Sequence, residues 1–184
     1  MRLGWIVLAA LAAMSPAQSA EVQIVDGDSF AYNGENIRLW GIDTPDANQE
    51  CRRGGKPWRP GPDAIAALRE ILARAEGMVC ETRDIDRNGR KVATCRAQGK
   101  DIGTQMVESG WAWDYFEYSR GFYIYAESLA QKDKRGVWSG ECAAPWRYRR
   151  SLRAPDKESP GLDGPMPRRQ PSRDLDSPSA TYRR

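Results

Sequence analysis

Apolar and polar residues alternate in three short stretches near the start of the chain. These stretches are Val22–Val25, Ser29–Tyr32 and Asn36–Trp40. Alternation with a period of two places one face of an extended segment against a core. Asn33-Gly34, between the last two stretches, is a tight-turn signal. The pattern predicts three antiparallel strands.

A helical period follows these strands. Gly61-Pro62 is expected to open a helix, because proline costs little at an early helical position where its missing N–H has no partner anyway. Gly77 is expected to end it. Its apolar face comprises Ile65, Leu68, Ile71 and Leu72.

Two more strands and two more helices are predicted further along. Met78–Asp84 and Lys91–Ala97 form a hairpin around Asp86–Gly89, and Asp101 caps a short helix that Gly110 ends. That short helix carries Ile102, Met106 and Val107. A last helix carries Phe122, Tyr125, Ala126, Leu129 and Ala130 on its apolar face, with Lys132, Lys134 and Arg135 near its negative end.

The order of these elements predicts the fold class. Three strands, a helix, two strands and two helices fit an α+β domain, a five-stranded OB-type β-barrel with about three helices. We expect this domain to occupy residues 21–150, since 184 residues suit one domain with appendages.

Both ends of the chain differ from the domain between them. Residues 1–20 combine Arg2, a 12-residue apolar run from Leu3 to Met14 and small residues, which is typical of a secretory signal peptide. An uncleaved anchor or a buried helix is the alternative. Residues 151–184 hold six of the twelve prolines and little apolar sequence, so we expect a disordered tail.

The four cysteines agree with an oxidising compartment. With Asp86–Gly89 as a four-residue loop, the hairpin register places Cys80 opposite Cys95, close enough for a disulfide. By elimination, Cys51 would pair with Cys142. No C-x-x-C spacing is present, so a thiolate metal site is not expected.

Composition excludes several kinds of chemistry. The chain has no histidine, which removes Ser-His-Asp and Cys-His catalysis and histidine-ligated zinc. The net charge of +3 belongs to the ends, because residues 21–150 hold 20 basic and 20 acidic residues. Binding of a polyanion would therefore depend on a local cluster and not on a broad basic surface.

Three polar clusters carry candidate chemistry. They are Asp26–Ser29, Ile37–Asp46 and Asp86–Arg90. Each has a structural reading when taken alone: a turn, a surface arginine followed by a proline-stiffened loop, and a charged hairpin tip.

Together, these clusters resemble the thermonuclease (micrococcal-type nuclease) family. The resemblance covers about residues 22–140. It rests on Val25–Phe30, Ile37–Pro45, Asp86–Arg90, Gly110–Ala112 and Lys134–Trp138. It implies an OB-type barrel and Ca²⁺-dependent hydrolysis of phosphodiester bonds in DNA and RNA.

The resemblance also implies roles for individual residues. Asp28 and Asp43 would ligate Ca²⁺ with their carboxylates and Thr44 with its backbone carbonyl, in keeping with the oxygen ligands that Ca²⁺ takes. Arg38 and Arg90 match two arginines that clamp the phosphate. A planar guanidinium can donate two hydrogen bonds to a phosphate and remains charged.

Two positions depart from the family pattern. Asp46 stands where the family has its general base, a glutamate, so the carboxylate reaches one methylene less toward the attacking water. Glu50 is an alternative base. Asn88 stands where the family often has a tyrosine that contacts the substrate phosphate.

Aromatic residues cluster in Trp111–Tyr118. Tyr115 and Tyr118 are candidates for stacking on bases. Packing in the core is the alternative role for such a cluster.

The sequence therefore predicts a secreted or periplasmic, Ca²⁺-dependent nuclease that acts on DNA and RNA. We expect a monomer with no stable membrane association once the signal peptide is removed. One alternative remains open, a weak or inactive OB-fold module that binds nucleic acid or protein without hydrolysis. A third possibility, a structural envelope protein that uses its tail for contacts, has no positive support in the sequence.

Overall fold

Six strands pair into one mixed sheet in the computed structural model, which describes residues 22–153. The order along the sheet is β1-β2-β3-β8-β7, with β9 paired to β8. The strands are β1 (Val22–Asp26), β2 (Ser29–Tyr32), β3 (Glu35–Leu39), β7 (Val79–Ile85), β8 (Lys91–Ala97) and β9 (Lys100–Asp101).

The pairing of β3 with β8 is parallel, whereas the other pairs in this sheet are antiparallel. This path agrees with a partly open OB-type arrangement, but the predicted barrel is not closed within residues 22–153. The two edge strands, β1 and β7, are not hydrogen-bonded to each other. Helix α1 (Gly61–Ala73) packs against β1 at one edge, and six of the seven residues of β7 are exposed at the other, so the sheet stays open.

Two small sheets complete the β-structure. Strand β4 (Ile42–Asp43) pairs with β10 (Trp113–Asp114), and β5 (Cys51–Arg53) pairs with β6 (Lys56–Trp58). The sequence pattern did not predict these four strands, because segments of two or three residues are too short to show alternation.

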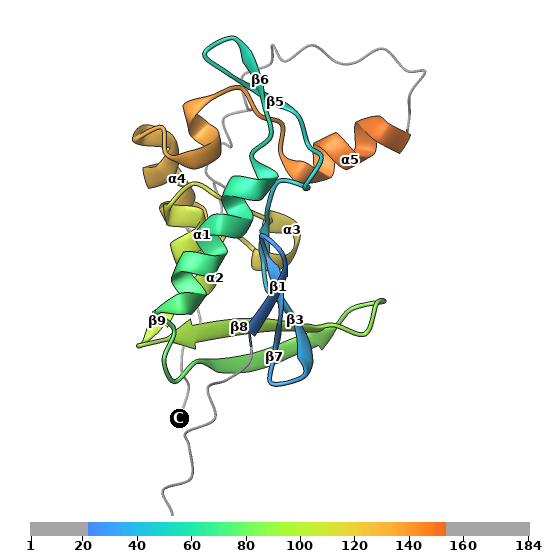
Figure 1. Cartoon of the computed structure of the whole chain (residues 1–184), viewed down its shortest axis with the longest axis vertical. Helices are drawn as coiled ribbons and strands as arrows, with labels where there is room; N and C mark the ends of the chain where they lie inside the picture. The colour runs from blue at the N-terminus through green and yellow to red at the C-terminus, as the bar shows by residue number, and fades with distance from the viewer. Residues whose placement is uncertain (1–21, 154–184) are drawn as a thin grey trace, which may run out of the picture.

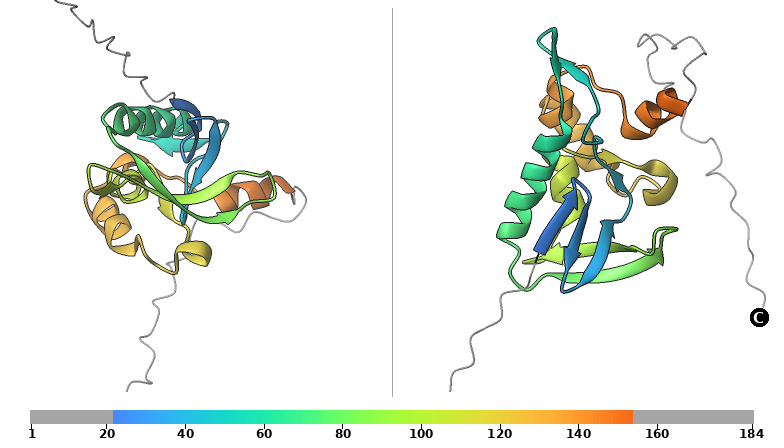
Figure 2. Two further views of the ribbon diagram at one scale, coloured as in Figure 1. Left: turned by 90° about the horizontal axis from the view of Figure 1, so that it is seen from below. Right: turned by 45° about the vertical axis from the view of Figure 1, so that its right-hand side comes forward.

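The described chain contains five α-helices and one short 3₁₀ helix, where about three helices were expected. The helices are α1, α2 (Ile102–Glu108), α3 (Phe116–Ser119), α4 (Ile124–Lys132), η1 (Gly136–Ser139) and α5 (Pro145–Arg153). Figures 1 and 2 show α5 on the other side of the strands from α1, α2 and α4.

The core lies between the sheet and helices α1, α2 and α4. Phe30, Ile37 and Leu39 from the strands pack with Leu68 of α1 and Met106 of α2, and all are at most 2% exposed. The predicted cap of α2 is present, since the Asp101 side chain accepts a hydrogen bond from the backbone N–H of Thr104 at 2.6 Å.

The predicted apolar face of the last helix is only half right. Ala126 and Ala130 are buried, but Phe122 and Tyr125 are exposed, by 58% and 73%. The chain turns at Gly121, so α4 begins only at Ile124, and the buried aromatic ring is that of Tyr123. The small alanines let α4 approach α2 closely.

Both expected disulfides are present in the structure. Cys80 faces Cys95 across the β7–β8 pair, as predicted, and is bonded to it. The register near the turn differs, because Ile85 pairs with Lys91, and an irregularity between Thr82 and Asp84 restores the alignment of the cysteines. Cys51 is bonded to Cys142, which fixes the segment before α5 to β5.

The expected signal peptide and most of the expected tail lie outside the described residues. The boundary expected at residue 150 falls inside α5, which continues to Arg153. Within residues 22–153, no helix has the length and apolar character required to cross a bilayer.

Candidate active site

Strand pairing brings the three polar clusters, Asp26–Ser29, Ile37–Asp46 and Asp86–Arg90, together. In the β2–β3–β8 ladder, Ser29 lies opposite Arg38 and Arg38 lies opposite Val92. Asp28 directly precedes Ser29, and Arg90 precedes Val92 by two residues. Residues more than 60 positions apart in the chain therefore meet at one end of the sheet.

Arg38 joins the two candidate metal-binding carboxylates. Its Nη1 donates to Asp28 Oδ1 at 2.9 Å, and its Nη2 donates to Asp43 Oδ1 at 3.2 Å. Asp28 and Asp43 are buried, whereas the arginine is partly exposed. Burial alone would lower the pKa of Arg38, but the attraction of both carboxylates outweighs it and raises the pKa.

Arg90 reaches the same network through a serine. Its Nη1 donates to Ser29 Oγ at 3.1 Å, and that hydroxyl donates to Asp28 Oδ1 at 2.7 Å. Asp86 holds the other side of the guanidinium, accepting from Arg90 Nε at 2.7 Å. Asp86 at the hairpin tip thus orients Arg90, and Ser29 is a contact to which the sequence analysis gave no role.

Asp43 is positioned by the small β4–β10 sheet. It lies opposite Trp113, and the Tyr115 backbone N–H donates to the Gly41 carbonyl at 2.9 Å. This pairing places the Trp111–Tyr118 segment beside the carboxylates.

Burial and the nearby Asp28 carboxylate raise the pKa of Asp43 to about 6, despite its two arginine partners. Burial, with a further contribution from Asp28, also raises the pKa of Asp26. Removal from water is thus the main cause that raises the pKa values of these carboxyls, and the repulsion of Asp28 adds to it.

Asp46, the candidate base, pairs with an arginine that the sequence analysis did not select. Arg149 of α5 donates from Nη1 to Asp46 Oδ1 at 2.8 Å and from Nη2 to Asp43 Oδ2 at 2.5 Å. Only the fold could identify Arg149, because it lies more than 100 residues from both partners in a segment that gave no signal beyond its positive charge.

The alternative base, Glu50, lies elsewhere on the surface. It pairs with Arg59 at 3.1 Å, and both side chains are largely exposed. Asn88 sits at the exposed hairpin tip, where its backbone N–H donates to Asp86. Asp46 therefore remains the better candidate for the base.

The two candidate stacking residues are adjacent. The ring centroids of Tyr115 and Tyr118 lie 4.9 Å apart. Tyr118 is exposed, whereas Trp146 of α5 stacks on Tyr115 with centroids 5.0 Å apart and an interplanar angle of 5°. Trp146 is the second α5 residue that the sequence analysis missed.

The donor set fits a hard cation in its chemistry. Asp28 and Asp43 provide buried carboxylate oxygens, and Thr44 Oγ1 is buried with no hydrogen-bond partner in residues 22–153. Ca²⁺ takes such oxygens together with carbonyls and water. Among the described residues, however, no group of three or more acidic or cysteine side chains is gathered as a metal-binding cluster.

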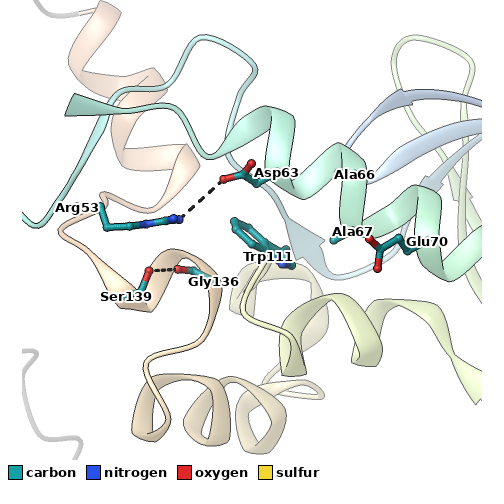
Figure 3. Close-up of a pocket in the computed structure, with 8 residues that line it drawn as sticks. All are labelled: Arg53, Asp63, Ala66, Ala67, Glu70, Trp111, Gly136 and Ser139. Atoms are coloured by element: carbon teal, nitrogen blue, oxygen red, sulfur yellow. Dashed lines mark hydrogen bonds and ion pairs between the residues drawn. The ribbon is translucent and has the colours of Figure 1, made fainter. Parts of the chain in front are cut away.

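A hollow of about 460 Å³ lies apart from these carboxylates, between α1 and η1 (Figure 3). Arg53, Asp63 and Trp111 line this hollow. The Arg53 guanidinium lies over the ring of Trp58, and its Nη2 is 3.8 Å from an Asp63 carboxylate oxygen. None of the residues in the arginine–carboxylate network lines it. It offers no candidate chemistry comparable with that network.

Comparison with known proteins places this geometry in context. The family model described as staphylococcal nuclease homologue matches residues 36–140. The succinoglycan biosynthesis protein ExoI of Rhizobium meliloti (strain 1021) is 35% identical over 149 residues, which cover 75% of this chain and 78% of that protein.

Two relatives carry nuclease names. The probable staphylococcal-like nuclease CAN1 of Oryza sativa subsp. japonica is 31% identical over 129 residues, covering 69% of this chain and 36% of that protein. An uncharacterized endonuclease of Haemophilus influenzae is 30% identical over 124 residues, covering 64% of each. The chain thus spans less than two thirds of these two proteins.

Proposed function

This chain belongs to the staphylococcal nuclease homologue family, and from that premise we propose that it is a secreted or periplasmic Ca²⁺-dependent nuclease that hydrolyses DNA and RNA. The observation that carries the proposal is the convergence of Asp28, Asp43, Arg38 and Arg90 through direct contacts and one bridging serine. Nuclease names among the relatives support the same reaction class.

The proposed metal ligands are Asp28, Asp43 and the Thr44 carbonyl. When bound, Ca²⁺ would supply a positive charge that polarises the phosphate and stabilises the charge that develops on it. The buried carboxylates suit this role because two like charges in a poorly solvated place favour a cation between them.

The remaining residues handle the proton and the phosphate. Asp46 accepts a proton from the attacking water, whose oxygen forms a bond to phosphorus as the bond to the leaving oxygen breaks. Arg38 and Arg90 donate hydrogen bonds to the phosphate oxygens, and Tyr115 and Tyr118 offer rings for stacking of a base. The absence of histidine is compatible with every one of these steps.

The proposed compartment is supported by two features. Residues 1–20 have the pattern of a signal peptide, and both cysteine pairs are disulfide-bonded, which is typical of oxidising compartments. Mass spectrometry of the protein purified from its native host tests this; a chain that begins at Met1 contradicts it.

A digestion experiment tests the reaction itself. We expect plasmid DNA and RNA to be cleaved with Ca²⁺ and to stay intact with a chelator. Asp43→Asn and Arg38→Ala should each lower the rate by about 10²–10³-fold, since the first weakens the hold on the proposed metal ion and the second removes a cation that stabilises the developing charge. Asp133→Asn, an exposed aspartate that pairs with Arg135, is the matched control and should retain the rate.

The shortened base has its own variant. Asp46→Asn should lower the rate by about 10²–10⁴-fold, the usual contribution of a general base, and Asp46→Glu should at least retain the wild-type rate because it restores the longer reach. Cleavage by Asp46→Asn at the wild-type rate would exclude Asp46 as the base.

One observation favours a second function, an OB-type module that binds nucleic acid or protein without hydrolysis. Arg149 already neutralises Asp43 and Asp46, the residues that the reaction needs. DNA that binds but stays intact with every chain, including Arg149→Met, would favour the module over the nuclease.

A further inference from the structure

Helix α5 lies over the proposed active site but contributes almost nothing to the core. Of its nine residues, Pro145 alone is buried, and the helix carries Arg147, Arg149, Arg150 and Arg153. Helices of globular proteins are usually stabilised by burying an apolar face, whereas α5 fully buries only Pro145 and half-buries Trp146 and Tyr148. Its position must therefore depend on a few specific contacts.

The segment before α5 is fixed firmly. Cys142 is bonded to Cys51, and the fully buried Gln49 donates from Nε2 to the Ala143 carbonyl at 2.6 Å. The Gln49 backbone N–H also donates to the Asp46 carbonyl at 2.9 Å. The start of α5 is thus tethered to the loop that carries the candidate base.

Beyond this tether, α5 is held by side-chain contacts with the proposed site. Arg149 binds Asp43 and Asp46, Trp146 stacks on Tyr115, and the Tyr148 hydroxyl donates to the Asn48 carbonyl at 3.2 Å. Arg147, Arg150 and Arg153 are exposed. Tyr148 bonds to the backbone, whereas Arg149 and Trp146 meet the carboxylates and the aromatic ring proposed to serve the reaction.

The contacts of Arg149 and Trp146 occupy the positions that a metal ion and a nucleic-acid base would take in the proposed site. Arg149 places a cation on Asp43, whose other oxygen is already bonded to Arg38, so neither oxygen of Asp43 is left without a cationic partner. Trp146 lies flat against Tyr115 in the manner of a nucleic-acid base. A metal ion on Asp43 and a base on Tyr115 would each compete with α5.

We propose that α5 is a built-in competitor of Ca²⁺ and nucleic acid, in which Arg149 occupies the cation position and Trp146 the base position until both are displaced. This inference rests on the proposed function, whose site it regulates. The tether at Cys142 lets the far part of α5 leave while its start stays in place. The small apolar burial of α5 keeps the cost of this opening low.

The first experiment measures Ca²⁺ binding to the full chain by calorimetry. Arg149→Met removes the charge and keeps the aliphatic stem, and we expect it to bind Ca²⁺ about 5–150-fold more tightly than wild type, the usual range of coupling between two ligands. Arg150→Met makes the same change at an exposed position of α5 and should bind as wild type does.

A second measurement follows the helix itself. With Ca²⁺ alone as the probe, hydrogen exchange of the amides in residues 146–153 should become faster in wild type, because α5 is displaced. Trp146→Ala should lower the KM for DNA with little change in kcat, since it vacates the ring face of Tyr115.

The outcomes separate the two proposals. The inference is overturned if wild type cleaves DNA and binds Ca²⁺ as tightly as Arg149→Met, or if Arg149→Met binds it more weakly. If neither wild type nor Arg149→Met nor Trp146→Ala binds Ca²⁺ or cleaves DNA, the proposed function fails and the inference fails with it.

Discussion

Glu127 shows how burial of a single carboxyl affects this protein. It lies on α4 and accepts the Asp114 backbone N–H at 3.2 Å. Burial raises its pKa from 4.5 to about 7, and the nearby Asp114 adds to the effect. The folded state therefore binds this proton more tightly than the unfolded chain does.

The sign of the pH dependence follows from that difference. Glu127 carries no penalty below about pH 4.5, and its contribution falls as the pH rises to about 7, when the buried carboxyl ionises. Glu127→Gln keeps the acceptor oxygen without the charge. We expect its stability advantage over wild type to be near zero at pH 4.5 and to grow to about 2–3 kcal/mol by pH 8, measured by urea unfolding.

Glu108→Gln is the control for this measurement, because Glu108 is an exposed carboxyl on α2. Its stability relative to wild type should change little over the same range. A difference between Glu127→Gln and wild type that does not vary with pH would contradict the prediction.

At the level of secondary-structure elements, helix α1 packs closely against the loop that carries Asp46. A Cβ at Gly61 would lie 2.6 Å from the Asp46 carbonyl oxygen and 2.7 Å from Ala47 Cα. These are backbone atoms and cannot rotate away. The absence of a side chain at Gly61 thus allows the first turn of α1 to press against the loop that holds Asp46.

Gly61→Ala should therefore damage both stability and activity. We expect a loss of about 1–3 kcal/mol in denaturant unfolding, since the helix or the loop must shift. The proposed nuclease activity of the folded fraction should also fall, because a small misplacement of Asp46, the proposed base, would slow the reaction. Pro62→Ala, at the adjacent exposed position, is the control, and equal effects of the two substitutions would exclude the packing argument.

The two disulfides act at the scale of the whole molecule. Cys51–Cys142 spans 91 residues and Cys80–Cys95 spans 15. In the loop-entropy treatment, the longer link restricts the unfolded chain more. Replacing Cys51 and Cys142 by serine should cost about 4–5 kcal/mol, and the same change at Cys80 and Cys95 about 3 kcal/mol.

Denaturant unfolding of the two double variants checks this order. The longer disulfide also tethers α5, so its removal should weaken the hold of α5 on the site as well as global stability. A larger loss of stability from the Cys80–Cys95 pair would contradict the loop-entropy argument.

Local sequence signals predicted the main strands, helices α1 and α2 near their observed positions, and the facing pair Cys80 and Cys95. Those features depend on alternation, capping and turn residues, which are properties of neighbouring positions. The resemblance joined motifs that are weak when taken alone and made Asp28, Arg38, Asp43 and Arg90 candidates, and the structure places these side chains in one network.

The tertiary structure decided what lies beside those residues. The open sheet, the exposure of Phe122, the bridging Ser29 and the contacts of Arg149 and Trp146 all depend on segments far apart in the chain. Helix α5 is amphipathic but rich in arginine and poor in apolar residues, and ion pairs and a ring stack hold it in place. Such contacts leave no periodic pattern in sequence, so only the folded chain could place an arginine and a tryptophan over the site.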